Sequence, residues 1–316
     1  MSNSLYKYGD MCLWQGRSSN NKEYIHQIVQ KLDLDNFQIN IPPKSYAILG
    51  FMSDEGVKRN LGREGAKQGP SSFRQALSGL PIHANFNLYD AGNVECLDGD
   101  LESAQNELAK RVRQMLSLGI RPVVIGGGHE TAWGHYSGVY QYYNDSVAVL
   151  NFDAHFDLRP LVDGKLGSSG TPFFQCNEML KQNNEKFDYY CAGIQPFSNT
   201  KSLFKYADDN GVKYRFAEDI NNTPNDTSFI QNIIDNHEKI YVTVCLDVFK
   251  SSIAPGVSAS QPFGIDTQYV VNSLRLLKQS GKVVSLDIVE LAPVFDINNQ
   301  TAKLASLLLM EYLNYE

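Results

Sequence analysis

The feature that most constrains the fold is a series of short apolar runs that alternate with longer segments of helical period. The apolar runs, rich in β-branched and aromatic residues, predict strands over 45–51, 121–127, 146–153, 187–194, 239–247 and 282–290. The remaining segments predict helices over 70–79, 101–118, 174–184, 199–210, 226–236, 267–280 and 298–314. Strands that are apolar on both faces and separated by helices indicate a parallel sheet covered on two sides. We therefore expect a three-layer αβα sandwich with a doubly wound, mostly parallel sheet.

Four of these predicted strands end in polar side chains that are unusual after apolar runs. The polar residues at or just after these C-terminal ends are His129, Asp153, His155, Asp157, Cys245, Asp247, Asp287 and Glu290. Because the carboxyl ends of parallel strands meet at one edge of a sheet, and ligands bind at that edge, we expect these side chains to converge. The sequence thus predicts a functional site there.

The stretch NFDAHFD places Asp153, His155 and Asp157 at alternate positions directly after an apolar run. Side chains of extended backbone alternate between faces, so all three can point to one side. Carboxylate oxygens together with an imidazole suit Mn²⁺, Fe²⁺ or Zn²⁺ better than Ca²⁺. The pattern favours a metal site over the alternative, a loop in which the aspartates cap a turn and the histidine packs.

Three other residues complete the candidate site. The segment GGGHE at 126–130 has neither the GxGxxG spacing nor the Lys-Ser/Thr pair of a nucleotide site, so we interpret His129 as a further metal ligand. The alternative is a hydrogen-bonded structural histidine. Asp247 closes an apolar strand, where a carboxylate needs a partner or a metal. Glu290 is a candidate for binding a cationic ligand group, and its alternative is a salt bridge to a surface lysine.

The net charge of the chain limits which binding partners we expect, and its cysteines indicate the cellular compartment. The net charge is −7 and the Lys and Arg residues are scattered, which gives no support to a nucleic-acid or membrane partner. No run approaches the ~18 apolar residues of a transmembrane helix, and the first residues lack the apolar core of a signal peptide. The five cysteines are widely spaced, with no CxxC pair. This usage is typical of reduced thiols, so we expect a cytoplasmic protein.

Taken together, these motifs resemble the ureohydrolase family, which includes arginase, agmatinase and formimidoylglutamase. The resemblance is carried by GREGAKQGPSSFRQAL (62–77), IGGGHE (125–130), NFDAHFD (151–157), SSGTPF (168–173), the aspartate–APG stretch (247–256) and DIVELAP (287–293). It implies a single catalytic domain over residues 1–316, with residues 1–40 as an N-terminal extension. It also implies an enzyme for a small, amino-acid-derived substrate, and a possible homo-oligomer, because family members are often assemblies.

The resemblance also implies a binuclear Mn²⁺ centre, in which a metal-bound hydroxide attacks an amidine-like carbon and the C–N bond breaks. The residues that match its ligands are His129 and Asp157 for one ion, His155 and Asp247 for the other, and Asp153 between them. Glu290 matches the carboxylate that holds the cationic C–N group of the substrate. The sequence SSGTPF lacks the histidine with which arginases transfer a proton, so the acid for the leaving amine is Asp157 or water. His135 lies near the motif in sequence, and its place in space is open.

Within the family, the details resemble formimidoylglutamase most closely. They are WQGR (14–17), HETAWGH (129–135) and Arg159 just after the predicted metal ligands. Arginine binds carboxylates bidentately, and N-formimidoyl-L-glutamate carries two of them, whereas agmatine has none. The resemblance therefore implies hydrolysis of N-formimidoyl-L-glutamate to L-glutamate and formamide in histidine degradation. The alternatives are an internal salt bridge for Arg159 and, for the chain, another ureohydrolase such as an agmatinase, guanidinobutyrase or arginase.

One position departs from the family pattern. Cys245 falls where the family has an aspartate that bridges the two metals. A thiolate is softer than a carboxylate and favours Zn²⁺ or Fe²⁺ over Mn²⁺. Three outcomes are open: Cys245 ligates as a thiolate, only one metal binds tightly, or the chain is a metal-depleted, non-catalytic homologue. We favour a functional centre with a weakened or unusual second site, because every other ligand is present.

Overall fold

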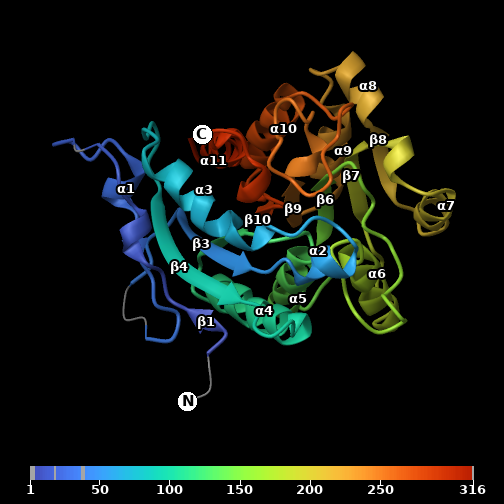
Figure 1. Cartoon of the computed structure of the whole chain (residues 1–316), viewed down its shortest axis with the longest axis horizontal. Coiled ribbons are helices and arrows are strands. Elements are labelled where there is room, and N and C mark those ends of the chain that lie inside the picture. Colours follow the sequence, from blue (N-terminus) through green and yellow to red (C-terminus); the bar gives the residue numbers. More distant parts are fainter. Residues whose placement is uncertain (1–3, 18, 37–39, 315–316) are drawn as a thin grey trace.

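A single large sheet organises the chain (Figure 1), and the computed structural model describes residues 4–17, 19–36 and 40–314. The strands are β1 (Tyr6–Lys7), β2 (Gln30–Lys31), β3 (Ser45–Met52), β4 (Asn87–Glu95), β5 (Arg121–Ile125), β6 (Ala148–Phe152), β7 (Tyr189–Ile194), β8 (Lys213–Phe216), β9 (Ile240–Cys245) and β10 (Val283–Val289). The α-helices are α1 (Ile25–Ile28), α2 (Glu55–Arg59), α3 (Gly69–Ser78), α4 (Leu101–Ser117), α5 (Thr131–Tyr143), α6 (Pro172–Gln182), α7 (Lys201–Asp209), α8 (Ala217–Asn222), α9 (Ser228–Asn236), α10 (Thr267–Ser280) and α11 (Gln300–Asn314). The short 3₁₀ helices are η1 (Met11–Leu13), η2 (Ala66–Gln68), η3 (Pro196–Ser198), η4 (Leu246–Val248) and η5 (Pro293–Phe295).

The strand order is β1-β4-β3-β5-β10-β9-β6-β7-β8, and β2 pairs with β4 beside this path. All pairs among the described strands are parallel except β1 with β4. In the central four strands, Ile125 lies opposite Ile288, Ile288 opposite Val244, and Val244 opposite Phe152. These strands therefore end at nearly the same level, and the residues that follow them meet at one edge.

The two faces of the sheet carry separate hydrophobic cores. On one face, strand residues such as Ile48 and Val244 pack with apolar residues of α3, α9, α10 and α11. On the other face, residues such as Leu49 and Val124 pack with α4, α5, α6 and α7. The helices lie in a layer on each side of the sheet (Figure 1). The predicted three-layer sandwich with a doubly wound, mostly parallel sheet is thus confirmed.

All six predicted strands and seven predicted helices are present, but other elements were missed. Strand β4 was missed because Asp90, Gly92 and Asn93 interrupt its apolar pattern. Helix α5 was missed because it is largely buried along its length and shows little amphipathic contrast. It packs against both α4 and α6, which covers it on more than one side.

The WQGR segment has a structural place in this fold. The indole of Trp14 is buried and donates to Asp90 Oδ2 at 2.6 Å. Asp90 also forms a buried ion pair with Arg74 of helix α3 at 2.9 Å. Trp14 does not line the cavity described below. The WQGR segment, which resembles formimidoylglutamase, therefore connects the N-terminal residues to β4 through this hydrogen bond.

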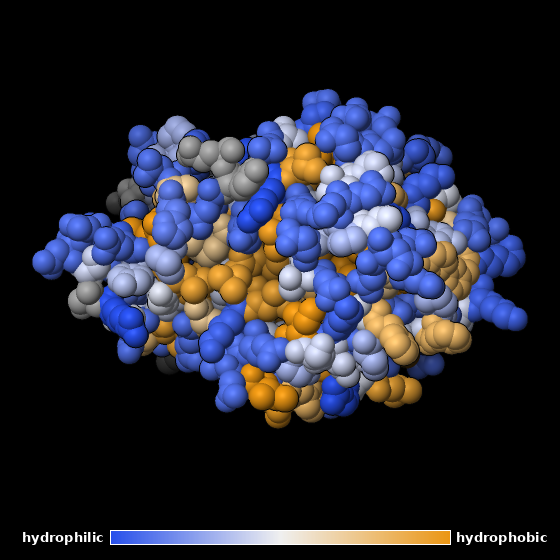
Figure 2. All heavy atoms as spheres, turned by 90° about the horizontal axis from the view of Figure 1, so that it is seen from above, coloured by the Kyte–Doolittle hydropathy of each residue, from blue (hydrophilic) through white to orange (hydrophobic). Residues whose placement is uncertain are grey.

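Figure 2 shows the hydropathy of the side chains on one face of the molecule. Hydrophilic side chains cover most of the face seen in Figure 2, and apolar ones gather in a band across its centre. Among the described residues, no helix combines the length and the apolar character that a membrane crossing requires.

Candidate metal centre

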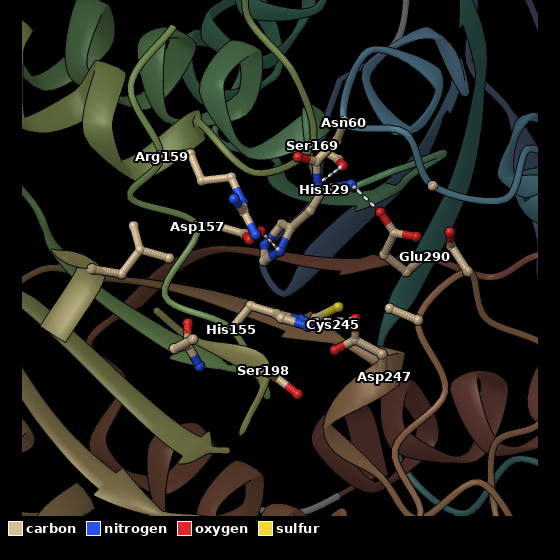
Figure 3. A pocket seen from close by; sticks show the side chains of 15 residues that line it. Asn60, His129, His155, Asp157, Arg159, Ser169, Ser198, Cys245, Asp247 and Glu290 are labelled. Carbon is tan, nitrogen blue, oxygen red and sulfur yellow. Dashed lines mark hydrogen bonds and ion pairs between the residues drawn. The ribbon is translucent and has the colours of Figure 1, made fainter. Parts of the chain in front are cut away.

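The residues predicted to converge surround a cavity at the carboxyl ends of β5, β6, β9 and β10 (Figure 3). The predicted site residues that line it are His129, His155, Asp157, Arg159, Cys245, Asp247 and Glu290. Asp153 is fully buried in contact with both histidines. Asp287 is the exception to the predicted convergence, because its side chain pairs with His135 at 2.7 Å and does not line the cavity.

The NFDAHFD segment leaves β6 at Phe152 and turns its polar side chains toward one point. The Nδ1 atom of His155 lies 3.3 Å from Asp153 Oδ1 and 3.2 Å from Asp247 Oδ2. The backbone N–H of His155 also donates to Asp153 Oδ1 at 2.8 Å. Asp157 adopts a left-handed backbone conformation, with φ of 49°, an uncommon one for a residue other than glycine. The structure therefore brings both carboxylates and the imidazole to one place, and no regular strand is needed for it.

The GGGHE segment carries His129 into the same cluster. Its Nδ1 atom lies 2.9 Å from Asp153 Oδ2 and 2.8 Å from Asp157 Oδ2. A side chain at Gly127 would place its Cβ only 1.7 Å from the carbonyl oxygen of Ser53, so this turn requires glycine. This close approach allows the segment to run next to Ser53 after β3, and His129 lines the cavity.

Strand β9 delivers the two remaining candidate ligands. Cys245 ends the strand, and Asp247 lies in the following helix η4. Asp247 Oδ1 is buried without any hydrogen-bond partner among the described residues. Burial and neighbouring carboxylates raise the pKa of Cys245 well above its usual value, so the thiol is protonated in the metal-free molecule.

Two groups of side chains have the composition and spacing of metal sites. One combines His129, Asp153 and Cys245, and the other combines Asp153, His155 and Asp247. In each group the potential ligand atoms lie within 4.8 Å of one another, and Asp153 belongs to both. The arrangement has room for two cations that share one carboxylate.

The electrostatics of the cluster favour a bound cation. Carboxyl groups of Asp153, Asp157, Asp247, Glu130 and Glu290 are gathered in or beside it, and no Lys or Arg forms an ion pair with them among the described residues. Burial raises the pKa of Asp157 to about 6 and that of Glu130 to about 7. A buried excess of acid is costly unless it is paired with positive charge or a metal. The donor set, three carboxylates with two imidazoles, therefore fits divalent cations such as Mn²⁺.

The two histidines balance part of this charge in the metal-free molecule. Burial lowers the pKa of His129, but hydrogen bonds to Asp153 and Asp157 outweigh burial and raise it well above its usual value. The pKa of His155 is raised in the same way, by Asp247 and Asp153 against the effect of burial. Although burial opposes it, the two imidazoles hold the pKa of Asp153 below its usual range.

Glu290 follows β10 and faces the cavity beside His129. It accepts the backbone N–H of His129 at 2.8 Å and also has a left-handed backbone, with φ of 69°. Among the described residues it makes no ion pair, so the alternative of a salt bridge to a surface lysine is wrong. Burial and the nearby acids Glu130 and Asp247 raise its pKa well above the usual value. A carboxyl group in this state can stabilise an incoming cation by releasing its proton.

Arg159 lies at the exposed side of the cavity, and Figure 3 shows its guanidinium extending toward Asp157. Its backbone N–H donates to Gly170 O at 2.9 Å. In the part of the chain that the structure describes, Arg159 has no ion-pair partner, so the alternative of an internal salt bridge is wrong. A free guanidinium at the mouth of an acidic cavity suits an anionic group of a ligand.

Several residues of the site were missed by sequence analysis. Asn60 and Ser169 line the cavity and hydrogen-bond each other at 3.2 Å. Ser198 lines it from the opposite side (Figure 3). Ser169 belongs to the SSGTPF motif, but the motif gave no reason to single it out, and no sequence signal marks Asn60 or Ser198. Glu130 was present in the GGGHE motif, but only the fold reveals that it is buried against Ser53 and Gly56.

Comparisons with known proteins agree with this geometry. A family model described as the arginase family matches residues 44–314. A formimidoylglutamase of Legionella pneumophila (strain Lens) is 43% identical over 314 residues, which cover 98% of both chains. A formimidoylglutamase of Clostridium tetani is 38% identical, covering 98% of this chain and 96% of that protein. The crystal structure of Trypanosoma cruzi formiminoglutamase with Mn²⁺ superposes with a TM-score of 0.78 at 26% identity, covering 85% of this chain and 92% of that one.

Proposed function

The chain belongs to the arginase family, and on that premise we propose that it hydrolyses N-formimidoyl-L-glutamate to L-glutamate and formamide. The observation that carries the proposal is the likeness to formimidoylglutamases over almost the full length of both chains. The acidic, imidazole-lined cavity supplies the chemistry that such a hydrolase requires. The enzyme is thus a hydrolase of carbon–nitrogen bonds in linear amidines, with a small-molecule substrate in the histidine degradation pathway.

The cofactor is Mn²⁺, and the centre has donors for two ions. We propose that His129, Asp157 and the thiol position of Cys245 hold one ion, that His155 and Asp247 hold the other, and that Asp153 is shared. When bound, the ions lower the pKa of a water molecule and provide hydroxide at neutral pH. The other five ligands, His129, Asp153, His155, Asp157 and Asp247, lie together in one cluster, which argues against the alternative of a metal-depleted, non-catalytic homologue.

Two side chains of this cavity have separate proposed roles, one in binding the substrate and one in proton transfer. We propose that Glu290 binds the protonated amidine, since its carboxyl faces the cavity within reach of the metal ligands. The cationic substrate favours the carboxylate form of Glu290, and the resulting pair orients the amidine carbon. We propose that Asp157 accepts the proton of the attacking water and returns it to the leaving nitrogen of glutamate. Its carboxylate lies 2.8 Å from the ring of His129 and lines the cavity, so it faces the place where the substrate would bind.

Arg159 is the proposed determinant for the acidic end of the substrate. Its guanidinium lies on the exposed side of the cavity, away from Glu290 (Figure 3). This arrangement separates a site for a cationic amidine from a site for a carboxylate. Agmatine carries no carboxylate, so the arrangement disfavours it, whereas N-formimidoyl-L-glutamate matches both ends.

A substrate panel with product identification tests the function. The Mn²⁺-loaded protein should release formamide and glutamate from N-formimidoyl-L-glutamate. It should release little or no urea from arginine, agmatine or guanidinobutyrate. Glu290→Gln, which keeps the shape and removes the charge, should reduce turnover strongly. Release of urea at a comparable or higher rate would reject this substrate in favour of another ureohydrolase.

We also propose a cytoplasmic enzyme that acts without a nucleic-acid or membrane partner. The five cysteines are free thiols, as is typical of a reducing compartment, and the chain carries a net negative charge. A single catalytic domain with an N-terminal extension near residues 1–40, and a homo-oligomer, stay predictions. The described N-terminal residues contribute β1 and β2 to the sheet, which supports including them in that domain.

A further inference from the structure

Arg59, the last residue of helix α2, lies beside the cavity without lining it. A guanidinium has five N–H donors, and here each of them makes a hydrogen bond. The Nε atom donates to Glu55 at 3.2 Å, and the two terminal nitrogens donate to the two oxygens of Glu102 at 2.6 and 3.2 Å. The other two donors go to the carbonyl oxygens of Gly99 at 2.9 Å and Gly167 at 3.1 Å. Arg59 therefore joins α2, the start of α4 and the loop that precedes α6.

That loop, residues 158–170, carries Arg159 along the edge of the cavity. Its tip at 163–166 is exposed, whereas residues 167–170 are buried. The Arg159 N–H donates to Gly170 O at 2.9 Å, which ties the outgoing part of the loop to the returning part. A Cβ at Gly170 would lie 2.9 Å from Arg159 Cδ, so the stem of Arg159 packs directly on this glycine. The position of residues 167–170 therefore determines where the Arg159 side chain lies.

Helix α2 and the residue that follows it hold the returning part of the loop through three hydrogen bonds. The Arg59 guanidinium donates to Gly167 O. The Ser169 N–H donates to Gly56 O at 3.0 Å, and the Asn60 side-chain amide donates to Ser169 Oγ at 3.2 Å. The bond from Arg59 is the one that involves a charged group, and such bonds are stronger than those between neutral groups. It is also the bond closest in sequence to the exposed tip.

Two carboxylates hold the Arg59 guanidinium in the orientation that the loop requires. Glu55 lies one helical turn earlier in α2, and Glu102 approaches from the first turn of α4. Glu102 Oε1 also accepts the Gly167 N–H at 3.4 Å, so it contacts both Arg59 and the loop. The Arg59 side chain is only 12% exposed. With its donors used by protein groups, Arg59 has none left for a ligand and acts on the cavity only through the loop.

We propose that Arg59 is a positioning residue for substrate recognition. By holding Gly167 it keeps residues 167–170 in place, and these residues fix Arg159 at the mouth of the cavity, where its guanidinium binds a carboxylate of the substrate. A supporting residue of this kind maintains the productive geometry of a binding group, so its loss weakens binding without removing a contact to the ligand. The inference rests on the proposed function, because it takes Arg159 as the residue that binds the acidic end of the substrate.

The test compares Arg59→Met with the parent, both loaded with Mn²⁺. Methionine keeps the aliphatic bulk and removes all the hydrogen bonds of the guanidinium. KM for N-formimidoyl-L-glutamate should rise about 10-fold, because the charged hydrogen bond from Arg159 to the substrate is weakened. The kcat should stay within about twofold of the parent value, since the metal ligands and Glu290 are unchanged. Calorimetric titration with L-glutamate, which has carboxylates but no amidine, should show a similar loss of affinity and needs no turnover.

Arg111 of helix α4 offers a matched control. It pairs with Glu107, four residues earlier in its helix, at 2.7 Å, and with the distant Asp35 at 2.6 Å. This arrangement repeats that of Arg59 with Glu55 and Glu102, but Arg111 does not line the cavity. Arg111→Met should therefore lower the melting temperature as Arg59→Met does, and should keep the KM and the L-glutamate affinity of the parent.

A purely structural role for Arg59 would make the two variants alike. If Arg59→Met melts at a lower temperature but keeps the KM and the L-glutamate affinity of the parent, the proposal is overturned. Equal rises of KM in Arg59→Met and Arg111→Met would also overturn it, because they would reflect lost stability and not a displaced loop. Should Arg59→Met fail to fold, Arg59→Lys decides in the same measurements, since lysine keeps the charge but lacks the planar fork of donors.

Failure of the proposed function would give a separate result. A parent that binds Mn²⁺ but does not turn over N-formimidoyl-L-glutamate would sink the proposed substrate. The titration with L-glutamate then decides the role of Arg59. Weaker binding in Arg59→Met than in the parent and Arg111→Met would support the proposal. Equal affinities, or a parent that does not bind L-glutamate, would overturn it.

Discussion

Two of the places where the chain buries charged side chains differ in how that charge is balanced. In the pair of Arg74 and Asp90, the guanidinium nitrogens donate to Asp90, Asn93 and the carbonyl oxygens of Pro70 and Gly92. Asp90 receives further hydrogen bonds from Trp14 and the Gly92 N–H. Around His129, by contrast, carboxyl groups outnumber the imidazoles, and Asp247 Oδ1 has no hydrogen-bond partner among the described residues.

The difference distinguishes a buried pair that supports the fold from a buried cluster that can bind a ligand. A buried ion pair whose donors and acceptors are all used has nothing left to offer a ligand. An acidic cluster with an unused oxygen and raised carboxyl pKa values is incomplete until a cation arrives. Balanced charge therefore marks the part of the molecule that supports the fold, and unbalanced charge marks the part that reacts.

The largest expected effect comes from removing an acid from the unbalanced cluster. Asp157→Asn should lower kcat by about 10³-fold or more, since it removes a proposed ligand and the proposed proton carrier. The metal-free variant should melt at the same temperature as the parent or higher, because the lost carboxylate is disfavoured by burial. Steady-state kinetics and thermal unfolding of the metal-stripped proteins measure the two effects. A variant that loses stability but keeps activity would break the comparison.

Removing one partner from the balanced pair should do the reverse. Arg74→Met leaves Asp90 buried without its main partner, which should reduce the free energy of unfolding by about 3–5 kcal/mol. Activity per folded molecule should be retained. Urea denaturation followed by circular dichroism gives the stability. Trp14→Phe removes one donor to the same carboxylate and serves as the milder control. Equal stability of Arg74→Met and the parent would contradict the structural role.

A second arginine, Arg159, sharpens the comparison, because it has no ion-pair partner among the described residues. Arg159→Ala should raise KM for N-formimidoyl-L-glutamate about 10- to 100-fold and change kcat little, since a charged hydrogen bond to the substrate is lost. The neighbouring exposed Lys165 provides the control, and Lys165→Ala should leave KM unchanged. Identical KM values for all three proteins would remove Arg159 from substrate recognition.

Stability should depend on pH differently with and without metal. In the folded metal-free protein, Asp157 and Glu130 keep their protons up to about pH 6 and 7, whereas unfolded carboxyls release theirs near pH 4. The folded state then binds more protons, so stability falls as pH rises through this window. The raised pKa values of His129 and His155 act in the same direction, since their contribution is lost as pH rises through the folded values.

The melting temperature of metal-stripped protein should therefore decrease by a few degrees from about pH 5 to about pH 8. Stabilisation by added Mn²⁺ should increase over the same range, because binding displaces protons from the ligands. Differential scanning calorimetry at several pH values measures both trends. A metal-free melting temperature that rises with pH would show that the acids are not in excess.

The smallest expected effect concerns Cys245. Replacing the thiol by a carboxylate in Cys245→Asp should tighten Mn²⁺ binding severalfold, since Mn²⁺ prefers oxygen ligands to a protonated thiol. Metal analysis and calorimetric titration of both proteins give the result. Cys245→Ser, which keeps a small uncharged group, is the control. Weaker Mn²⁺ binding in the aspartate variant would indicate that the parent site is built around the sulfur.

Local pattern was sufficient for six strands, including the central four, and for the candidate ligands within NFDAHFD and GGGHE. The apolar runs are contiguous and the acidic and imidazole residues directly follow them, so periodicity and position reveal both. Local pattern was insufficient where the role of a residue depends on a partner that is distant in sequence. Asp90 reads as a break in a strand until Arg74 is placed beside it. Asn60 and Ser169 show their place in the site only when the fold brings them together at the cavity.

The position of β10 has a consequence for how the protein is made. It is the last strand in sequence, yet it lies between β5 and β9 in the middle of the sheet. While the ribosome is still synthesising residues before 283, two half-sheets face each other across an open slot. Glu290 and the final strand arrive together, so a nascent chain has no partly competent form. His129 follows β5 and the other ligands follow β6 and β9, so the complete ligand set comes together only once β10 joins the two halves, and until then the edges of β5 and β9 are unpaired.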